Sequence, residues 1–219
     1  LRRQRQMCIR DSHGKRFSEY FDSWMKLRNG DKQFSIFQSV TLLATVGIPA
    51  ISINYLPEIA ASLKVNKFDY PRFIQSFGEF CSDEDGFLRL RCSRLFSSVV
   101  LENLAISEKI NIVRNLIYEL AKDLKEGERT YNNEIFKHLI RASSLTKIVG
   151  LDEQRSIEFL IELQESCKHL SYYWIQLGIL YRASEQFEEA ENAFEYAKNA
   201  HGYENYQIAH TTAKNYMEW

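Results

Sequence analysis

The chain of 219 residues has few residues that interrupt helices, since it contains only 3 Pro and 9 Gly. It also lacks any uninterrupted apolar run near the roughly 18–20 residues that a membrane-spanning helix needs, so no such span is expected. Its 4 Cys form no CxxC pair and no regular spacing, which argues against a zinc site and against a disulfide framework. An apolar fraction of 45% and a charged fraction of 26% are ordinary for a soluble globular protein. We therefore expect a protein of the reducing cytoplasm.

Signatures of catalysis are missing as well. The sequence holds no GxxxxGK[ST] phosphate loop, no GxSxG elbow, no HExxH pair and no GxGxxG fingerprint. Its five His are scattered without a ligand-spaced partner, and the acidic run Ser82–Gly86 lacks the later acidic ligand of an EF-hand loop. We predict no catalytic residue, no metal and no cofactor in this chain, and an enzyme acting by itself has no candidate site.

The first twelve residues, LRRQRQMCIRDS, need separate treatment. Residues Arg2–Asp11 match, one for one, the conceptual translation of a transposase adapter used in DNA sequencing, so we exclude residues 1–12 from the fold as an artefact. We expect the natural gene to extend upstream. Without the four Arg and one Asp of this segment, 24 basic and 28 acidic residues remain, a formal charge of −4. The Arg-rich arm therefore carries no argument for nucleic-acid binding.

After a helical lead-in over residues 13–32, the region 33–104 has a pattern of three helices. Apolar spacing predicts helices over Phe34–Val46, Tyr55–Leu63 and Phe68–Phe77. We expect Asn54 to cap the second helix and Asp69 to cap the third.

A short β-hairpin is expected next, because the apolar residues alternate after the DEDG turn. Phe87, Leu88 and Leu90 flank Arg89 and Arg91. Three helices followed by a hairpin is the order of a winged helix, and a plain helical bundle with an irregular loop is the alternative.

One local basic cluster lies at the end of this hairpin, and it consists of Arg89, Arg91 and Arg94. The cluster leads into a predicted helix over Ser93–Leu104, whose N-terminus favours an anion. These arginines are our candidate phosphate contacts, and a surface wing without a ligand is the alternative.

Residues 105–219 are predicted to be entirely helical. A continuous apolar stripe runs along the first helix, and its members are Ile106, Ile110, Val113, Ile117, Leu120 and Leu124. Further helices are expected over Tyr131–Ile148, which Gly150 closes, and over Glu153–His169, which Asp152 caps. The helix over Tyr131–Ile148 is expected to bury Ile135, Phe136, Leu139 and Ile140. The helix over Glu153–His169 is expected to bury Ile157, Leu160, Ile161 and Leu163. Because the connections between these helices are short, we expect neighbouring helices to be antiparallel.

The stretch Tyr172–Ala200 fits one tetratricopeptide repeat, a helix–turn–helix of about 34 residues with the pattern W-x₂-L-G-x₂-Y…A-x₃-F. The matching positions are Trp174, Leu177, Gly178, Tyr181, Ala190, Phe194 and Ala197. We assign them packing roles: the small residues let two helices approach, and the large ones fill the space between them. A further helix follows over Tyr203–Trp219, with Tyr206, Ile208, Ala209 and Ala213 as expected contacts. The predicted fold is therefore mainly α, a winged-helix-like domain followed by an α-solenoid of tetratricopeptide-like hairpins.

The order of these parts resembles the C-terminal half of bacterial STAND NTPases linked to antiviral defence. The likeness spans about residues 34–219 and rests on the hairpin leading into RCSRLFSSVVLENL, the helix Tyr172–Gln176 before the repeat and the helix Gln207–Ala213 after it. The resemblance implies an upstream P-loop module that holds ATP and Mg²⁺, a winged helix that acts as an internal latch, and helical repeats that recognise a protein partner. It also implies oligomerisation on activation.

Two other functions stay open. A free-standing tetratricopeptide scaffold would bind a protein or peptide through its helical face. A winged-helix regulator would bind DNA, but the predicted recognition helix carries only Arg72, near Asp69 and Glu79, and the net charge of −4 argues against nucleic acid.

Overall fold

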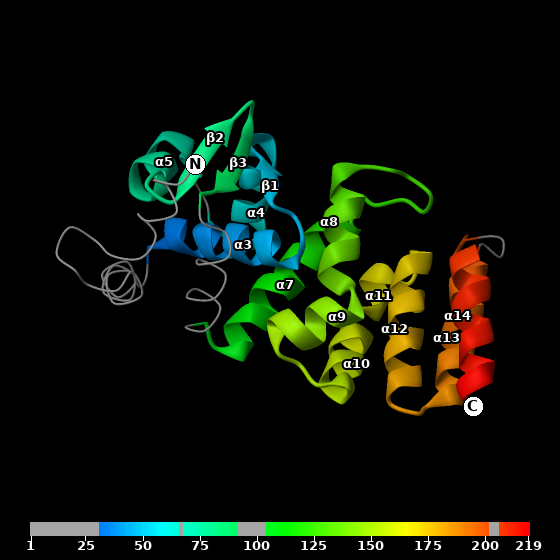
Figure 1. The fold of residues 1–219 in the computed structure, drawn as a ribbon. Coiled ribbons are helices and arrows are strands. Elements are labelled where there is room, and N and C mark those ends of the chain that lie inside the picture. The colour runs from blue at the N-terminus through cyan, green and yellow to red at the C-terminus, as the bar shows by residue number, and fades with distance from the viewer. Residues whose placement is uncertain (1–30, 66–67, 92–103, 202–205) are drawn as a thin grey trace, which may run out of the picture. The chain divides into compact units, whose positions relative to one another are not determined.

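The computed structural model describes residues 31–65, 68–91, 104–201 and 206–219 (Figure 1). The adapter-like segment, residues 13–30 of the lead-in, Arg94 and most of the helix expected over Ser93–Leu104 lie outside these residues. The described part is mainly helical and contains one small antiparallel sheet. Its contacts divide the chain into two compact units, Leu1–Ala105 (unit 1) and Ile106–Trp219 (unit 2). Each unit is described by itself.

Unit 1 alternates helices with short strands in the order helix, strand, helix, helix, strand, strand. The elements are α3 (Lys32–Val46), β1 (Ala50–Ser52), the 3₁₀ turn η1 (Ile53–Tyr55), α4 (Leu56–Ser62), α5 (Tyr70–Phe77), β2 (Cys81–Glu84) and β3 (Phe87–Leu90). Helix α3 begins where the Asp31 carboxylate accepts a hydrogen bond from the Gln33 N–H at 2.9 Å, and it ends at Gly47, whose φ is 112°. A carboxylate cap and a left-handed glycine are the usual ends of a stable helix.

The second helix of unit 1 differs from the prediction. Asn54 does not cap it, because residues 50–52 form strand β1 and Ile53–Tyr55 a 3₁₀ turn, so α4 begins only at Leu56. The strand exists because Ile51 pairs with Leu88, 37 positions away, which local apolar spacing cannot reveal. The cap of the third helix is confirmed, since Asp69 accepts from the Arg72 N–H at 3.2 Å.

The three strands form an antiparallel sheet in the order β1-β3-β2. The predicted hairpin is confirmed: β2 and β3 are joined by Asp85 and Gly86, with φ values of 54° and 79°. Two residues in the left-handed region match the twist of a tight hairpin, and Asp-Gly is a favoured pair there. In the buried core of unit 1, the Phe77 ring stacks on Phe37 with centroids 4.9 Å apart and contacts Phe73 at the same distance.

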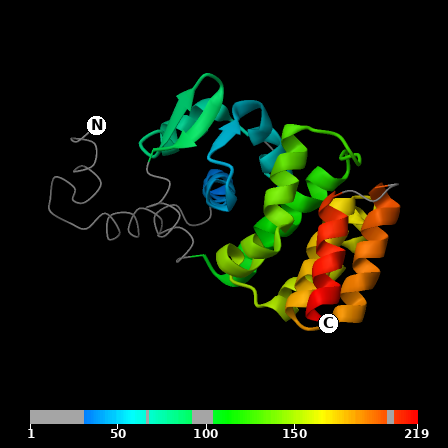
Figure 2. The same cartoon turned by 45° about the vertical axis from the view of Figure 1, so that its right-hand side comes forward.

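Within its described residues, the regular elements of unit 2 are all helices, as expected. They are α7 (Ile106–Ala121), α8 (Tyr131–Ile140), α9 (Ala142–Ser144), the π-helical turn η2 (Leu145–Val149), α10 (Glu153–Glu162), α11 (Gln164–Cys167), α12 (Ser171–Ala183), α13 (Phe187–His201) and α14 (Tyr206–Glu218). Figures 1 and 2 show α12, α13 and α14 side by side, in yellow, orange and red.

Two predicted helices of unit 2 are in fact broken. The helix expected over Tyr131–Ile148 is interrupted at Arg141, whose φ of −57° and ψ of 128° are extended, although its four predicted core residues are all buried. The break is stabilised from outside, because the Ala142 N–H donates to the Gln176 Oε1 of α12 at 3.0 Å. The helix expected over Glu153–His169 divides into α10 and α11, although Asp152 caps it as predicted, accepting from the Arg155 N–H at 2.8 Å.

Several predicted core positions point to solvent instead. Ile106 is 42% exposed and Ile161 is 46% exposed, while Phe159 is buried in α10. In α14, Ile208 is buried as expected. The other three expected contacts are exposed, and Thr211 and Asn215 take their place; the exposed three are Tyr206, Ala209 and Ala213. The helix itself is confirmed, but the expectation for these three residues was wrong, because the inward face of α14 carries polar groups: the Asn215 Nδ2 donates to the Phe187 carbonyl at 3.0 Å.

Candidate binding groove

The hairpin of α12 and α13 is built on a close contact at Gly178. A Cβ atom placed there would lie 2.4 Å from the Phe194 Cε1 atom, far inside van der Waals contact. Ala190 and Ala197 are fully buried on α13 and present only methyl groups to the interface. The two helices can approach because the residues between them are small, and Phe194 fills the space that Gly178 leaves.

Hydrogen bonds from aromatic side chains fix α12 against the preceding helices. The Tyr173 hydroxyl donates to the Leu160 carbonyl of α10 at 2.7 Å, and the Trp174 Nε1–H donates to the Lys168 carbonyl at 2.8 Å. Burial raises the pKa of Tyr173 above its ordinary value, so its hydroxyl stays protonated and remains a donor. Both rings are therefore held in one orientation, and Trp174, which is only 8% exposed, lines the bottom of a groove.

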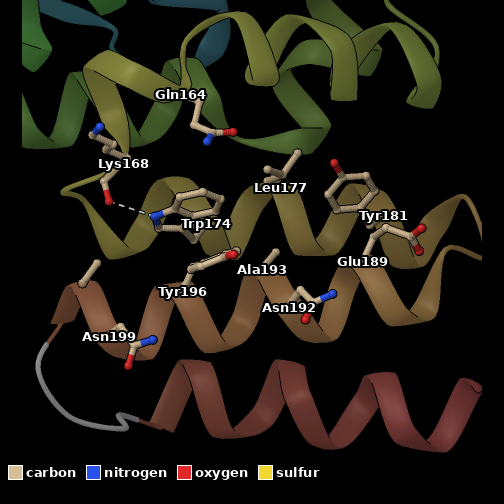
Figure 3. A pocket seen from close by; sticks show the side chains of 11 residues that line it. Gln164, Lys168, Trp174, Leu177, Tyr181, Glu189, Asn192, Ala193, Tyr196 and Asn199 are labelled. Carbon is tan, nitrogen blue, oxygen red and sulfur yellow. Dashed lines mark hydrogen bonds between the residues drawn. The ribbon is translucent and has the colours of Figure 1, made fainter.

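This groove has a volume of about 710 Å³ and runs between α13 on one side and the α11 region on the other (Figure 3). The volume is within the range of ligand sites on proteins. Side chains of α12 lie between these two walls (Figure 3). The lining residues are Gln164, Lys168, Trp174, Leu177, Tyr181, Glu189, Asn192, Ala193, Tyr196, Asn199 and Ala200.

The middle of the groove is apolar and aromatic. Leu177 and Ala193 are each only 2% exposed, so they form its floor. Tyr196 is 54% exposed, and its ring lies over Trp174 with centroids 4.7 Å apart. An exposed aromatic ring held by a buried one offers apolar area at little cost in conformational entropy.

The walls of the groove carry amide groups that are not engaged elsewhere. Within the described residues, the side chains of Gln164, Asn192 and Asn199 have no hydrogen-bond partner. Each primary amide provides two donors and one carbonyl acceptor. At these three places the groove can therefore donate a hydrogen bond to a peptide carbonyl and accept one from a peptide N–H group.

Charges mark the two ends of the groove. Figure 3 shows Lys168 at one end and Glu189, beside Tyr181, at the other. Burial, and then the Glu189 carboxylate, raise the pKa of the Tyr181 hydroxyl. Tyr181 is thus a neutral donor beside an anion, and the groove has a positive end and a negative end.

The repeat residues named from the sequence fall into two sets in the structure. Trp174, Leu177 and Tyr181 line the groove. The other four lie in the hairpin interior, and they are Gly178, Ala190, Phe194 and Ala197. Sequence reasoning missed the amides and Tyr196, although their spacing of four and three residues in α13, at Asn192, Tyr196 and Asn199, places them on one helix face.

The candidate phosphate contacts of unit 1 have partners within the hairpin. Arg89 Nε lies 3.7 Å from a Glu84 carboxylate oxygen, and Arg91 Nε donates to the Cys81 carbonyl at 2.9 Å. Burial raises the pKa of the Cys81 thiol to about 12, and the nearby Arg91 opposes this shift. Arg94, the third member, lies outside the described residues.

Neither a metal site nor a membrane span is found in the described ranges. They contain no group of three His, Cys, Asp or Glu side chains arranged to hold an ion. None of the helices in these ranges combines the length and the apolar character needed to cross a bilayer.

Searches against protein-family models, curated proteins and solved structures find no match to this chain. The groove must therefore be interpreted from its own chemistry.

Proposed function

We propose that unit 2 is a protein-interaction region that binds an extended segment of another protein in the α12–α13 groove. The observation that carries this proposal is the combination of an apolar floor, an exposed ring at Tyr196 and three unengaged amides. An extended peptide presents N–H and C=O groups along its length and alternating side chains, so it can use the amides and the floor together.

The length of the groove suits a short peptide better than a compact metabolite. Its wall on α13 runs from Glu189 to Ala200, about 16 Å at the helical rise of 1.5 Å per residue. An extended chain covers that distance in about five residues at 3.3 Å each. The walls therefore match one short linear segment.

The test is a selection of random linear peptides displayed on phage, with the full 219-residue chain as bait. We expect enriched clones whose synthetic peptides lose at least about tenfold in affinity when Asn192→Trp fills the groove. The matched control is Glu195→Trp, an exposed position of the same helix that does not line the groove. A selection that gives no clones, or clones equally sensitive to both variants, contradicts the proposal.

For unit 1 we propose a winged helix that serves as an internal latch, the role implied by the resemblance to STAND NTPases. The order of its elements and the sheet order β1-β3-β2 support the winged helix. The tip of the hairpin supports a latch over a DNA reader, because Asp83, Glu84 and Asp85 are all exposed there. Acidic side chains at that position repel phosphates.

Two measurements test the latch. We expect no salt-dependent shift of duplex DNA by the purified chain, and such a shift would favour the DNA-binding alternative.

The nucleotide switch itself requires a P-loop encoded in the same gene, so genomic sequence upstream of the codon for His13 should contain GxxxxGK[ST]. Genomic sequence that lacks this motif contradicts membership of the STAND class and leaves the peptide-binding proposal untouched.

A further inference from the structure

The two ends of the groove differ in whether their charges are already paired within the described residues. Glu189 lies in the first turn of α13, together with Glu188, and Glu185 lies in the turn just before this helix. None of these three carboxylates has a cationic partner in the described part of the chain. A cation brought to this end would therefore pair with these carboxylates without displacing another cation, and the positive end of the α13 dipole offsets part of the gain.

The positive end carries Lys168, which is already paired. Its Nζ lies 2.8 Å from a Glu165 carboxylate oxygen, with side-chain exposures of 55% and 81%. Exposed pairs of this kind contribute little to stability because solvent screens them. Lys168 can therefore exchange Glu165 for an acidic group that enters the groove, but with a smaller gain than at the Glu189 end.

The two ends also set a spacing. Figure 3 shows Lys168 at the end of the groove where Trp174, Tyr196 and Asn199 lie, with Glu189 at the opposite end. From Glu189 to Asn199 is about 15 Å along α13. Side chains four residues apart on an extended segment are about 13 Å apart and point to the same side.

We infer that the groove selects an extended segment of about five residues with opposite charges at its ends. A Lys or Arg lies at the Glu189 end, an Asp or Glu lies four residues away at the Lys168 end, and the middle side chain packs on Tyr196 and Leu177. The inference rests on the proposed peptide-binding function and adds the chemistry of the peptide. It leaves the chain direction open, because the amides can serve a peptide of either direction.

The experiment uses four pentapeptides with blocked termini, a fluorescent label and the full 219-residue chain. Two have opposite charges in the two orders, Asp-Ala-Tyr-Ala-Arg and Arg-Ala-Tyr-Ala-Asp, and two have like charges, with Asp or with Arg at both ends. Fluorescence anisotropy at low ionic strength should give the better opposite-charge peptide about tenfold tighter binding than either like-charge peptide. The difference should shrink to less than about threefold at 0.5 M salt.

Charge reversal in the groove should change the preference rather than simply weaken binding. Glu189→Lys should make the doubly acidic peptide the best ligand, and Lys168→Glu should favour the doubly basic one by a smaller factor. Glu153→Lys is the control for the first, since Glu153 is exposed in the first turn of α10. Lys122→Glu is the control for the second, since Lys122 pairs with Glu119 three residues before it, as Lys168 does with Glu165.

The outcomes separate this inference from the proposed function. Equal binding of all four pentapeptides, or an unchanged preference in Glu189→Lys, overturns the charge pattern even when phage-selected peptides still require the groove. A selection without groove-dependent clones removes both proposals. If circular dichroism shows that Glu189→Lys is unfolded, the Glu189→Gln variant is used in its place. In that variant, the affinities of the doubly acidic and the opposite-charge peptides should differ by less than about threefold.

Discussion

Unit 1 packs large aromatic rings against one another, whereas unit 2 brings its helices together over residues with little or no side chain. In unit 1, the rings of Phe37 and Phe77 are nearly parallel, with an interplanar angle of 10°. In unit 2, Gly178 and Ala190 lie at the contact between α12 and α13. Large rings from α3 and α5 fill the interior of unit 1, whose strands have only three or four residues. The antiparallel helices α12 and α13 instead gain most from close approach of their backbones.

The glycines of the two units show the same difference. Gly86 has a φ of 79° and no atom within 4 Å of the position where a Cβ would stand, so its role is conformational. Gly178 lies in a helix, and its role is to leave room for Phe194. One residue type thus serves a backbone requirement in unit 1 and a packing requirement in unit 2.

The largest effect is expected from a ring deletion in unit 1. Phe77→Ala should reduce the local free energy of unfolding by about 3–5 kcal/mol, because it removes fully buried apolar area and leaves a cavity. Site-resolved hydrogen exchange of the β2 and β3 amides measures this loss. Phe87→Ala, at a position 40% exposed, is the control and should cost less than about 1 kcal/mol. Equal losses in the two variants would contradict an aromatic core centred on Phe77.

The next effect tests the close approach in unit 2. Gly178→Ala should destabilise the helical hairpin by about 1–3 kcal/mol through overpacking against Phe194, although alanine favours helices. Denaturation followed by tryptophan fluorescence reports on it, since Trp174 lies in α12. Combining it with Phe194→Leu should recover part of the loss, because the clash disappears. If the stability losses of the two single variants simply add in the double variant, a clash between residue 178 and Phe194 is not the cause of the destabilisation.

A smaller effect is expected where α12 supports the break at Arg141. Gln176→Leu removes the acceptor of the Ala142 N–H in a buried environment, which should cost about 1–2 kcal/mol. Faster hydrogen exchange at the Ala142 amide is the specific readout. Gln154→Leu, which removes an exposed amide bonded to Glu158 at 3.3 Å, should change stability by less than about 0.5 kcal/mol. An unchanged Ala142 exchange rate would mean that α9 does not depend on this bond.

The smallest effect concerns the turn of unit 1. Gly86→Ala should cost about 1 kcal/mol, since its positive φ disfavours any side chain even in open space. Gly86→Asn should cost less, because asparagine tolerates the left-handed region. Thermal unfolding of the two variants gives the comparison. A loss for Gly86→Ala as large as that for Gly178→Ala would contradict the division between conformational and packing glycines.

Much of the local structure could be predicted because its causes are local. Asp69 and Asp152 accept from backbone N–H groups three residues away, and the Asp85–Gly86 turn depends on two adjacent backbone conformations. Strand β1 could not be predicted, because three residues become a strand only when β3 lies beside them. The break at Arg141 likewise depends on Gln176, 34 positions after Ala142.

The candidate site, too, was predictable from the sequence only where its causes are local. From the sequence, the repeat spacing of Trp174, Leu177 and Tyr181 determined a helical hairpin, and the small residues Gly178 and Ala190 determined a close contact between its two helices. The groove was decided only by the tertiary structure, since it needs Lys168 from before α12 and Asn199 from α13 on opposite sides of the same surface. A sequence specifies which side chains one helix presents, but which helix lies opposite them depends on the packing of the whole unit.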